Sequence, residues 1–398
     1  MLKKQRKIQL KNKTILLGIS GGVAAYKTVE LARRLKDEGA SVIVIMTDAA
    51  RNFVTPLSLE VASQNKVHCS LFEDPMAHIN LPASADLMVI APATANIISK
   101  FANGIADDLL STCLLSYSGK LIIAPSMNWK MYENRIFQSN LKKLVSLGII
   151  QTGPEKGVLA CGEEGIGRMS EIPDLIEIIR STLSKKDLKE ESIVVTAGPT
   201  REYLDPVRFI SNRSSGKMGY ALTRAARNRG AKVTLISGPT ALKTPDGLNF
   251  IRVETTDEMM IAVKKNTTNT TVLIMAAAVS DFGPAKRSEV KIAKAKITSL
   301  DLRQTTDIIS EISRSAQRPF IIGFAAETGK NISRAVEKMK KKNMDMIVFN
   351  DVTEPGAGFE VDTNRVVIIN RKKKNRLALM SKDAVADAIL DSFIKTKT

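Results

Sequence analysis

The chain has 398 residues, which is more than one ordinary hydrophobic core needs and suits two domains if roughly 150 residues are expected per domain. Its composition, with 44% hydrophobic and 25% charged residues, excludes a disordered or fibrous protein. The 59 lysine and arginine residues outnumber the 41 acidic residues, and the resulting net charge of +18 favours anionic partners such as nucleotides, phosphorylated metabolites, nucleic acid or membrane surfaces.

The N-terminal residues 1–13 form a basic extension, and an apolar run with small residues follows it, as in a signal peptide. The run at 14–20 is also typical of a buried strand, and we prefer this interpretation because an amphipathic helix pattern comes next. No apolar run approaches the length of a membrane-spanning helix, so no membrane association is expected. The three cysteines lie far apart without a CxxC pair, which predicts no disulfide framework, no zinc site and a cytoplasmic location.

Short apolar runs alternate with helical patterns along the first half of the chain. Strands are predicted at residues 14–20, 41–47, 86–93 and 120–126, with an amphipathic helix between the first two. This alternation is typical of a parallel sheet that is covered by helices and buried on both faces. A helix at 171–183 precedes a polar and charged segment, where we place the domain boundary: the first domain spans 14–184 and the linker spans 185–191.

The second domain, residues 192–398, repeats the pattern of the first. A strand at 192–200, a helix at 219–230 and a strand at 232–237 come first. Further strands are predicted at 271–278, 319–326, 345–351 and 365–370, and further helices at 305–316, 331–342 and 380–394. The expected fold class is therefore α/β, with two Rossmann-like three-layer domains.

Three turns of small residues follow predicted strands in the first half: GISGGVAAYK, which begins at Gly18, APATAN at 91–96 and APSMN at 124–128. Because the carboxyl ends of parallel strands form the ligand crevice of such sheets, three turns at these ends favour a cofactor site. Taken alone, the first turn is explained equally well by a tight connection without a ligand, since the GxGxxG spacing is absent. Asn128 in the third turn is either a buried amide of the turn or a ligand-binding side chain.

Two other features of the first half suit chemistry. His68 and His78 are the only histidines, so a general base that titrates near neutral pH is one of them or a residue with a shifted pKa. His78 precedes a predicted strand and is placed to project into the crevice, although a lone histidine is more often structural. Cys161 lies among glycines in GVLACGEEGIGRM, which predicts an exposed thiol on a flexible loop, suited to a movable lid.

Together the motifs GISGGVAAYK, HINLP, PATANIISKFANGIADDLL, PSMNWKMYEN and ACGEEGIGRM resemble the flavoprotein domain of phosphopantothenoylcysteine decarboxylases. The resemblance implies a flavodoxin-like domain that binds FMN through Gly18, Ser20, Gly21, Ala93, Thr94 and Asn96. It also implies that His78 is the base at the cysteine part of the substrate, that Asn128 holds the substrate carboxylate, and that Cys161 is the acid on the lid. The chain departs from the family pattern at Pro82, Ser126 and Tyr132, which affects the packing of the substrate and not the reaction.

The stretch SSGKMG, residues 214–219, contains the Gly-Lys of a P-loop, but Met218 stands where that loop needs a hydroxyl for the metal ion. The longer segment AGPTREYLDPVRFISNRSSGKMG resembles the nucleotide signature of phosphopantothenate–cysteine ligases, which makes this turn a phosphate site at a helix N-terminus. The bacterial ligases use CTP with Mg²⁺ or Mn²⁺ and form an acyl-cytidylate, so the resemblance implies CTP as co-substrate.

The ligase resemblance also implies individual residues, although it assigns no metal ligand. Asn212 would bind the acyl-cytidylate, and Lys291 would act from a mobile basic loop over the nucleotide. CTP would be contacted by Asp281, Thr306, Asp307, Ile308, Ile309, Phe324, Lys338 and Lys342, with Thr306 standing where the family often has proline. Each lysine can also be read as a solvated surface residue, and this reading is strongest for Lys338 and Lys342, which lie four positions apart in a basic run.

The whole chain resembles the bacterial bifunctional coenzyme A biosynthesis proteins, which join L-cysteine to 4'-phosphopantothenate and decarboxylate the product to 4'-phosphopantetheine. The family implies a homo-oligomer, with trimers of flavin domains and dimers of ligase domains combined into a dodecamer. A nucleic-acid-binding protein is the alternative that the net charge of +18 suggests, but only 5% of residues are aromatic and no recognition motif is present, so no nucleic-acid partner is expected. A decarboxylase of peptidyl cysteines is a third interpretation, which the ligase-like half opposes.

Overall fold

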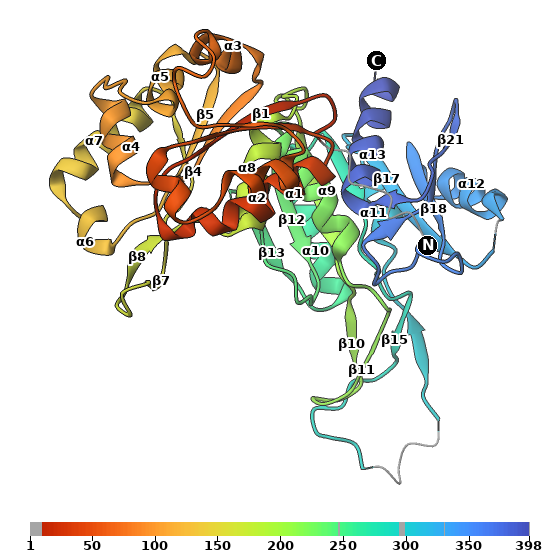
Figure 1. Cartoon of the computed structure of the whole chain (residues 1–398). Coiled ribbons are helices and arrows are strands. Elements are labelled where there is room, and N and C mark those ends of the chain that lie inside the picture. Colours follow the sequence, from red (N-terminus) through yellow and green to blue (C-terminus); the bar gives the residue numbers. More distant parts are fainter. Residues whose placement is uncertain (1–9, 246, 294–298, 330, 398) are drawn as a thin grey trace. The chain divides into compact units, whose positions relative to one another are not determined.

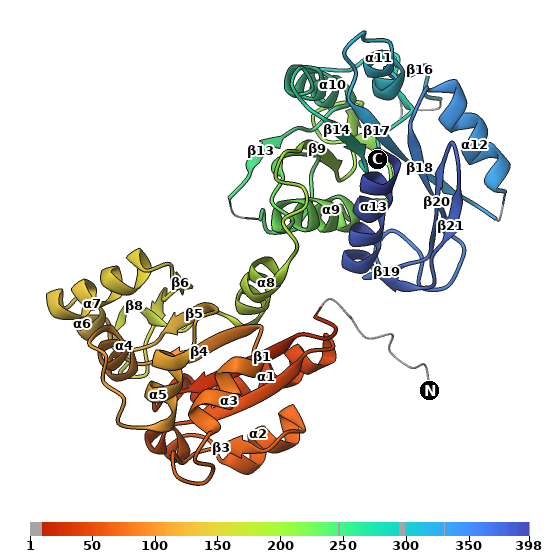
Figure 2. The ribbon, with the colours of Figure 1, turned by 90° about the horizontal axis from the view of Figure 1, so that it is seen from above.

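The computed structural model describes residues 10–245, 247–293, 299–329 and 331–397 (Figure 1). Contacts divide the described chain between Ser184 and Lys185 into two compact units (Figure 2). Residues 1–9 of the predicted basic extension lie outside the described residues. The end of that extension belongs to the first unit, because Leu10 is buried in its core and the Leu10 N–H donates to the carbonyl oxygen of Glu38.

The first unit is built on a six-stranded parallel sheet in the order β3-β2-β1-β4-β5-β6. The strands are β1 (Thr14–Ile19), β2 (Ser41–Met46), β3 (Val67–His68), β4 (Leu87–Ala93), β5 (Lys120–Pro125) and β6 (Ile150–Gln151). The longer strands consist mainly of apolar residues, and most of their residues are buried, because both faces of the sheet are covered. The order is the doubly wound one, and without the two-residue edge strand β3 it is the flavodoxin-like order that the sequence predicts.

Helices cover both faces of this sheet, as the alternating pattern predicts. One face packs against α1 (Lys27–Asp37), α2 (Pro56–Ser63) and α8 (Ile172–Leu183). The other face packs against α3 (Ala77–Ser84), α4 (Ala95–Ala102), α5 (Leu109–Ser116) and α7 (Arg135–Ser146). Short helical turns follow strands β1, β2 and β5, namely η1 (Val23–Tyr26), η2 (Asp48–Asn52) and α6 (Trp129–Tyr132).

The segment around Cys161 differs from its prediction as a flexible loop. Strands β7 (Glu155–Val158) and β8 (Glu164–Arg168) pair as an antiparallel hairpin, and Cys161 lies exposed in the turn between them. The exposed thiol is as predicted, but the residues on both sides of it form paired strands, which the glycine-rich composition conceals. A Cβ on Gly167 would lie 2.1 Å from the backbone oxygen of Met127, so a glycine is what lets β8 approach that segment.

The second unit contains an eight-stranded sheet in the order β13-β12-β9-β14-β17-β18-β20-β21. The strands are β9 (Ser192–Ala197), β12 (Lys232–Ser237), β13 (Asn249–Arg252), β14 (Val272–Met275), β17 (Phe320–Glu327), β18 (Met346–Asp351), β20 (Val366–Asn370) and β21 (Lys374–Arg376). Neighbours from β13 to β18 pair in parallel, whereas β20 and β21 pair antiparallel at one edge. The chain order reverses direction between β9 and β14, which is where such sheets open a ligand crevice.

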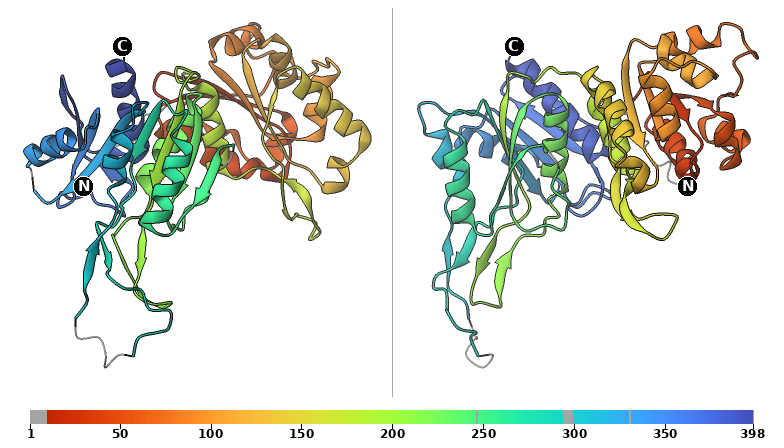
Figure 3. Two further views of the ribbon diagram at one scale, coloured as in Figure 1. Left: turned by 180° about the vertical axis from the view of Figure 1, so that it is seen from behind. Right: turned by 90° about the vertical axis from the view of Figure 1, so that its left-hand side faces the viewer.

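Helices α9 (Lys217–Asn228) and α13 (Lys382–Lys397) cover one face of the second sheet. Helices α10 (Thr256–Asn266), α11 (Ile308–Ser313) and α12 (Ile332–Lys341) cover the other. The two-stranded pairs β10 (Arg201–Tyr203) with β11 (Phe209–Ser211) and β15 (Phe282–Pro284) with β16 (Leu302–Gln304) extend from the body of this unit (Figure 3). Among the described residues, no helix has both the length and the apolar character needed to cross a membrane.

Candidate active sites

The first site lies where β1 and β4 diverge, and a buried serine joins the two strand ends. The Ser20 hydroxyl donates to the carbonyl oxygen of Pro92 at 2.7 Å and accepts from the Thr94 N–H at 3.0 Å. Ser20 is 2% exposed, so these hydrogen bonds are protected from water and fix the two turns relative to each other. Ser20, Ala93 and Thr94, which the resemblance implies for FMN, are therefore neighbours at the crevice.

The glycine turn after β1 is shaped by a close backbone approach. A Cβ on Gly21 would lie 2.4 Å from the Cβ of Ala49 and 2.9 Å from its carbonyl oxygen, so a side chain there would displace the turn after β2. Gly18 lies within β1, and Asn96 lies exposed in the first turn of α4.

Donors and apolar surface are both present beside these turns. Thr94 is the N-cap of α4 but makes no side-chain capping bond, so backbone N–H groups of the first turn are left for a ligand. Val23 is 54% exposed and Phe53 is 48% exposed in the segments that follow β1 and β2. A helix N-terminus with adjacent apolar side chains fits the phosphate and ring of a flavin mononucleotide.

His78 lies on α3, and its Nδ1 atom is buried without a hydrogen-bond partner. Its carbonyl oxygen accepts from the Ser116 hydroxyl at 2.5 Å, which ties α3 to the end of α5. Within the part of the chain that the structure describes, no hydrogen bond joins His78 to Asn128 or Cys161. A buried ring nitrogen without a hydrogen-bond partner is consistent with a side chain whose partner is a bound ligand.

Asn128 and Cys161 are brought together by the hairpin. The Nδ2 atom of Asn128 lies 3.4 Å from Sγ of Cys161, while Oδ1 of Asn128 accepts from the Lys130 N–H and caps α6. Glu163 holds this arrangement from the other side: its carboxylate accepts from Trp129 Nε1 at 2.8 Å and from Lys130 Nζ at 3.0 Å. The hydrogen bonds from Lys130 and Trp129 lower the pKa of Glu163.

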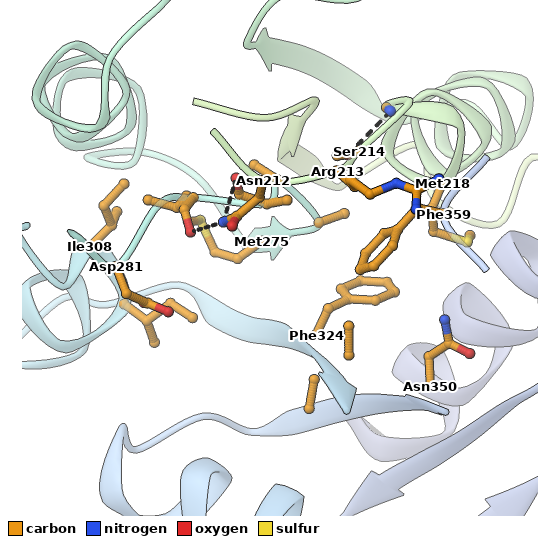
Figure 4. A pocket seen from close by; sticks show the side chains of 18 of the residues that line it. Asn212, Arg213, Ser214, Met218, Met275, Asp281, Ile308, Phe324, Asn350 and Phe359 are labelled. Atoms are coloured by element: carbon orange, nitrogen blue, oxygen red, sulfur yellow. Dashed lines mark hydrogen bonds between the residues drawn. The ribbon is translucent and has the colours of Figure 1, made fainter. Parts of the chain in front are cut away.

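The second site is a cavity of about 610 Å³ in the second unit (Figure 4). It is lined by every ligase residue that the resemblance implies except Lys291, namely Asn212, Asp281, Thr306, Asp307, Ile308, Ile309, Phe324, Lys338 and Lys342. Asn212 and Asp281 lie in the segments after β11 and β14, Phe324 lies within β17, and the other residues lie in or next to α11 and α12, so only the fold brings them together. The phosphate turn Ser214–Met218 lines the same cavity.

The phosphate turn is a left-handed turn that opens α9. Gly216 has φ = 74° and is the N-cap of α9, and no side chain caps this helix. A Cβ on Gly216 would lie 2.7 Å from the side chain of Thr240, which adds a second reason for glycine there. The helix N-terminus points its unpaired N–H groups at the cavity, as a phosphate group requires.

Asn212 lies at the edge of the cavity, where its Nδ2 atom donates to the carbonyl oxygens of Ala278 at 3.4 Å and Val279 at 2.9 Å (Figure 4). These hydrogen bonds fix the amide beside the segment that follows β14, and Asp281 lies a few residues further along that segment. The rings of Phe324 and Phe359 also line the cavity (Figure 4).

Two lysines of α12 and the following turn contribute positive charge to the cavity, whose wall also includes Arg213, Lys217 and Lys382. Lys342 Nζ lies 3.0 Å from Oδ2 of Asp307, and Lys338 Nζ lies 3.5 Å from the carbonyl oxygen of Phe324. Burial lowers the pKa of Lys338, and the charge of Lys342 lowers it further. Burial alone would raise the pKa of Asp307, but hydrogen bonds from Ser310 and Lys342 make the net shift a lowering.

Lys291 does not line this cavity and lies exposed on the segment after β15. This segment is held beside the β10–β11 pair by Arg208, which donates to the carbonyl oxygen of Ile292 at 3.0 Å. The lysine at the end of the KIAK motif, residue 294, lies outside the described residues. Within the described ranges, no group of three or more histidine, cysteine or acidic side chains forms a metal site.

The sequence did not predict four other residues of the cavity, Asn350, Phe359, Asn364 and Lys382. Asn350 lies one residue before the end of the strand predicted at 345–351, and strand ends were the signal used elsewhere in the chain. Phe359 and Asn364 lie in or after the glycine-containing loop that follows this strand. Lys382 begins α13, within the helix predicted at 380–394, and nothing near it in the sequence points to a cavity.

Comparisons with known proteins match both units. The Flavoprotein family matches residues 3–184, and the family described as "DNA/pantothenate metabolism flavoprotein C-terminal domain" matches residues 188–396. The coenzyme A biosynthesis bifunctional protein CoaBC of Vibrio cholerae is 44% identical over 389 residues, covering 96% of this chain and 98% of that protein.

Two solved structures are each similar to less than half of the chain. A mutant PPC decarboxylase complexed with pantothenoylaminoethenethiol has 32% sequence identity and a TM-score of 0.39, and the match covers 43% of this chain and 97% of that one. The FMN-dependent cysteine decarboxylase SpaF has 28% identity and a TM-score of 0.39, covering 44% of this chain and 97% of that one.

Proposed function

The chain belongs to the family of bifunctional coenzyme A biosynthesis proteins, which combine a phosphopantothenoylcysteine decarboxylase with a phosphopantothenate–cysteine ligase, and from this membership we propose how its two sites divide the chemistry. The second unit joins L-cysteine to 4'-phosphopantothenate at the expense of CTP, through an acyl-cytidylate. The first unit decarboxylates 4'-phosphopantothenoylcysteine to 4'-phosphopantetheine with FMN. The decarboxylase domain spans 14–184 and the ligase domain spans 192–398. Residues 185–191, which the sequence predicts as a linker, pack with the second unit, where Leu188 is buried in the core.

One observation carries the ligase assignment: the cavity of about 610 Å³ joins the phosphate turn to side chains from separate strand ends and helices. A carboxylate does not react with an amine until its oxygen becomes a leaving group, and transfer of a cytidylyl group achieves this. The N–H groups at the start of α9 bind phosphate oxygens, and Lys338 and Lys342 stabilise the negative charge that develops on them.

The remaining ligase residues position the acyl group and the base. Asn212, fixed by two backbone carbonyls, presents its Oδ1 atom to the acyl-cytidylate. Thr306, Asp307, Ile308 and Ile309 contact the nucleotide at the start of α11, and Phe324 contacts it from β17. Lys291 does not line the cavity in this structure, and we propose that it reaches the nucleotide when the basic segment moves over the site. Mg²⁺ or Mn²⁺, when bound with the nucleotide, would offset the negative charge of the phosphates, and Asp281 and Asp307 are the carboxylates of the described cavity wall.

In the first unit, Gly18, Ser20, Gly21, Ala93, Thr94 and Asn96 hold the flavin. FMN, when bound, supplies the electron sink that loss of CO₂ from a saturated carboxylate needs. Asn128 binds the carboxylate of the cysteine part, and His78 is the base beside it. The thiol of Cys161 donates a proton to the product, and the β7–β8 hairpin excludes water while it does so.

The presence of two sites opposes the alternatives. A nucleic-acid-binding protein does not need cavities built from strand ends, and a decarboxylase of peptidyl cysteines does not need a ligase unit. Cytoplasmic location and a homo-oligomer with trimeric flavin and dimeric ligase contacts remain part of this proposal.

The test is incubation of the purified protein with 4'-phosphopantothenate, L-cysteine, CTP and Mg²⁺, with products followed by mass spectrometry. The wild type is expected to make 4'-phosphopantetheine and pyrophosphate. Asn212→Asp is expected to make no cysteine adduct, whereas Cys161→Ser is expected to make the adduct and stop before the final product. If neither CTP nor ATP supports adduct formation by the wild type, the ligase assignment is wrong.

A further inference from the structure

Lys382 is a buried cation in the wall of the second cavity. It is 5% exposed and begins α13. Its Nζ atom donates to three backbone carbonyl oxygens of one loop, those of Gly358 at 3.3 Å, Phe359 at 2.9 Å and Val361 at 2.5 Å. Its backbone N–H donates to the carbonyl oxygen of Asp362 at 2.9 Å, so the same residue anchors the loop through main chain and side chain.

This position is unfavourable for a positive charge in two ways. The N-terminus of a helix repels cations, and a buried ammonium loses its hydration. Burial, together with the nearby charge of Lys217, lowers the pKa of Lys382 to about 8. An ammonium has three N–H donors, which matches the three carbonyl acceptors, so its hydrogen bonds to the loop offset the unfavourable surroundings.

The same loop is held from its other side by the phosphate turn. The Ser215 hydroxyl donates to the carbonyl oxygen of Phe359 at 2.6 Å. Lys217 Nζ donates to the carbonyl oxygen of Glu360 at 2.8 Å and to Oδ1 of Asp362 at 2.8 Å. Residues 358–362, which we name the clamp loop, therefore connect Lys382 with the turn that opens α9.

The phosphate turn depends on this contact because little else fixes its side chains. Gly216 supplies a left-handed backbone but no side chain, and no side-chain cap orders the N-terminus of α9. The carbonyl oxygen of Phe359 accepts from Ser215 and from Lys382 together. A loop that loses its anchor at Lys382 would consequently lose its hold on Ser215 and Lys217.

We propose that Lys382 is a positioning residue of the ligase reaction: its ammonium fixes the clamp loop, and the clamp loop holds Ser215 and Lys217 in the arrangement that receives the nucleotide phosphates. The proposal rests on the proposed use of CTP at this cavity. It requires no contact between Lys382 and the substrate. Loss of the Lys382 ammonium is therefore expected to weaken binding of the nucleotide and to leave binding of cysteine unchanged.

The experiment measures CTP-dependent pyrophosphate release by the full chain, with KM determined separately for CTP and for cysteine. Lys382→Met is expected to raise the KM for CTP about tenfold or more, because hydrogen bonds to a charged group are lost, and to leave the KM for cysteine within about twofold. Lys395→Met, at an exposed position of the same helix, is the matched control and is expected to behave as the wild type. Lys382→Arg, which keeps the charge and several donors, is expected to restore part of the nucleotide affinity.

A double-mutant cycle with Ser215→Ala separates positioning from general stability. Both residues act on the carbonyl oxygen of Phe359, so the double variant is expected to raise the KM for CTP by much less than the product of the two single effects. Three results would each overturn the proposal. They are a KM for CTP in the double variant that equals the product of the two single effects, an equal rise of the KM for CTP and the KM for cysteine in Lys382→Met, and an unchanged KM for CTP in Lys382→Met. If Lys382→Met does not fold, the KM for CTP is compared instead in Lys382→Arg, in Ser215→Ala and in their double variant, and the same outcomes apply. An inactive wild type would instead refute the proposed function.

Discussion

Nδ2 of Asn128 lies 3.4 Å from Sγ of Cys161, although the two residues are 33 positions apart and belong to a helix cap and a hairpin turn. Glu163 keeps them together: its carboxylate accepts from Trp129 and Lys130, the first residues of the capped helix, and also from the Cys161 thiol at 3.8 Å. The carboxylate thus ties the turn of the hairpin to α6, and the thiol is placed beside the amide.

Glu163→Gln is expected to slow the decarboxylase about tenfold, because displacement of a catalytic group by a fraction of an ångström is costly in rate. Glutamine can still accept from Trp129 but loses the ion pair with Lys130. The rate is measured by incubating each variant with 4'-phosphopantothenoylcysteine, stopping the reaction at set times and quantifying the 4'-phosphopantetheine formed. Glu164→Gln is the control, since Glu164 makes only a distant exposed pair with Lys156 at 3.6 Å. Equal rates for the two variants would contradict a positioning role for Glu163.

Gly167→Ala tests whether the hairpin must rest on the segment before α6. The new Cβ would lie 2.1 Å from the carbonyl oxygen of Met127, and the Met127 N–H donates to the carbonyl oxygen of Gly167 at 3.1 Å. Backbone atoms cannot move aside cheaply, so decarboxylase activity is expected to fall more than about tenfold while ligase activity is unchanged. Gly157→Ala in β7 is the control, because its Cβ would meet only the end of the Arg168 side chain. Full decarboxylase activity in Gly167→Ala would show that the hairpin does not need this contact.

Ser20→Ala tests the junction of β1 and β4. It leaves the partly buried Thr94 N–H without its acceptor, which is expected to lower the free energy of unfolding by about 1 kcal/mol. The two turns at the flavin site are also released from each other, so the protein is expected to retain less flavin after purification. Denaturant titration and the flavin-to-protein absorbance ratio measure the two effects. Ser84→Ala, which removes an exposed bond to Leu81, is expected to change neither; an unchanged flavin ratio in Ser20→Ala would argue against the assigned site.

The sheets of both units could be predicted from the sequence because their strands are continuous apolar runs. The predicted strand at 345–351 corresponds to β18 (Met346–Asp351), and the predicted helix at 380–394 corresponds to α13 (Lys382–Lys397). Strand pairs such as β10 with β11 could not be predicted, because three-residue strands without an apolar period acquire their pairing only from the body that supports them.

The site residues divide in the same way. Asn212 and Phe324 lie in motifs of contiguous sequence, so they could be proposed from the resemblance alone. Lys382 could not, since its role depends on a loop that closes on it from some twenty residues earlier in the chain. The pairing of Glu163 with Trp129 has the same origin: no local pattern reports a contact across 34 positions.

The buried lysine Lys338 predicts a pH dependence of the ligase. Its pKa is lowered by burial and then by Lys342, so the side chain loses its proton below the usual lysine value of about 10.4. Only the protonated form attracts phosphate oxygens, and the KM for CTP is therefore expected to rise with pH through that lowered pKa. Lys338→Met is expected to have a raised KM at neutral pH and a flatter pH profile, although Lys382, with its pKa of about 8, still titrates in it.

Protein stability should move in the opposite direction across the same range. Because the folded-state pKa of Lys338 lies below its unfolded value, the unfolded chain binds more protons between the two, and this group contributes stability that increases with pH. A rise in KM together with a constant or higher unfolding midpoint therefore indicates a loss of phosphate attraction and not denaturation. Parallel pH profiles of KM for the wild type and Lys338→Met would show that Lys338 does not carry the charge that binds the nucleotide.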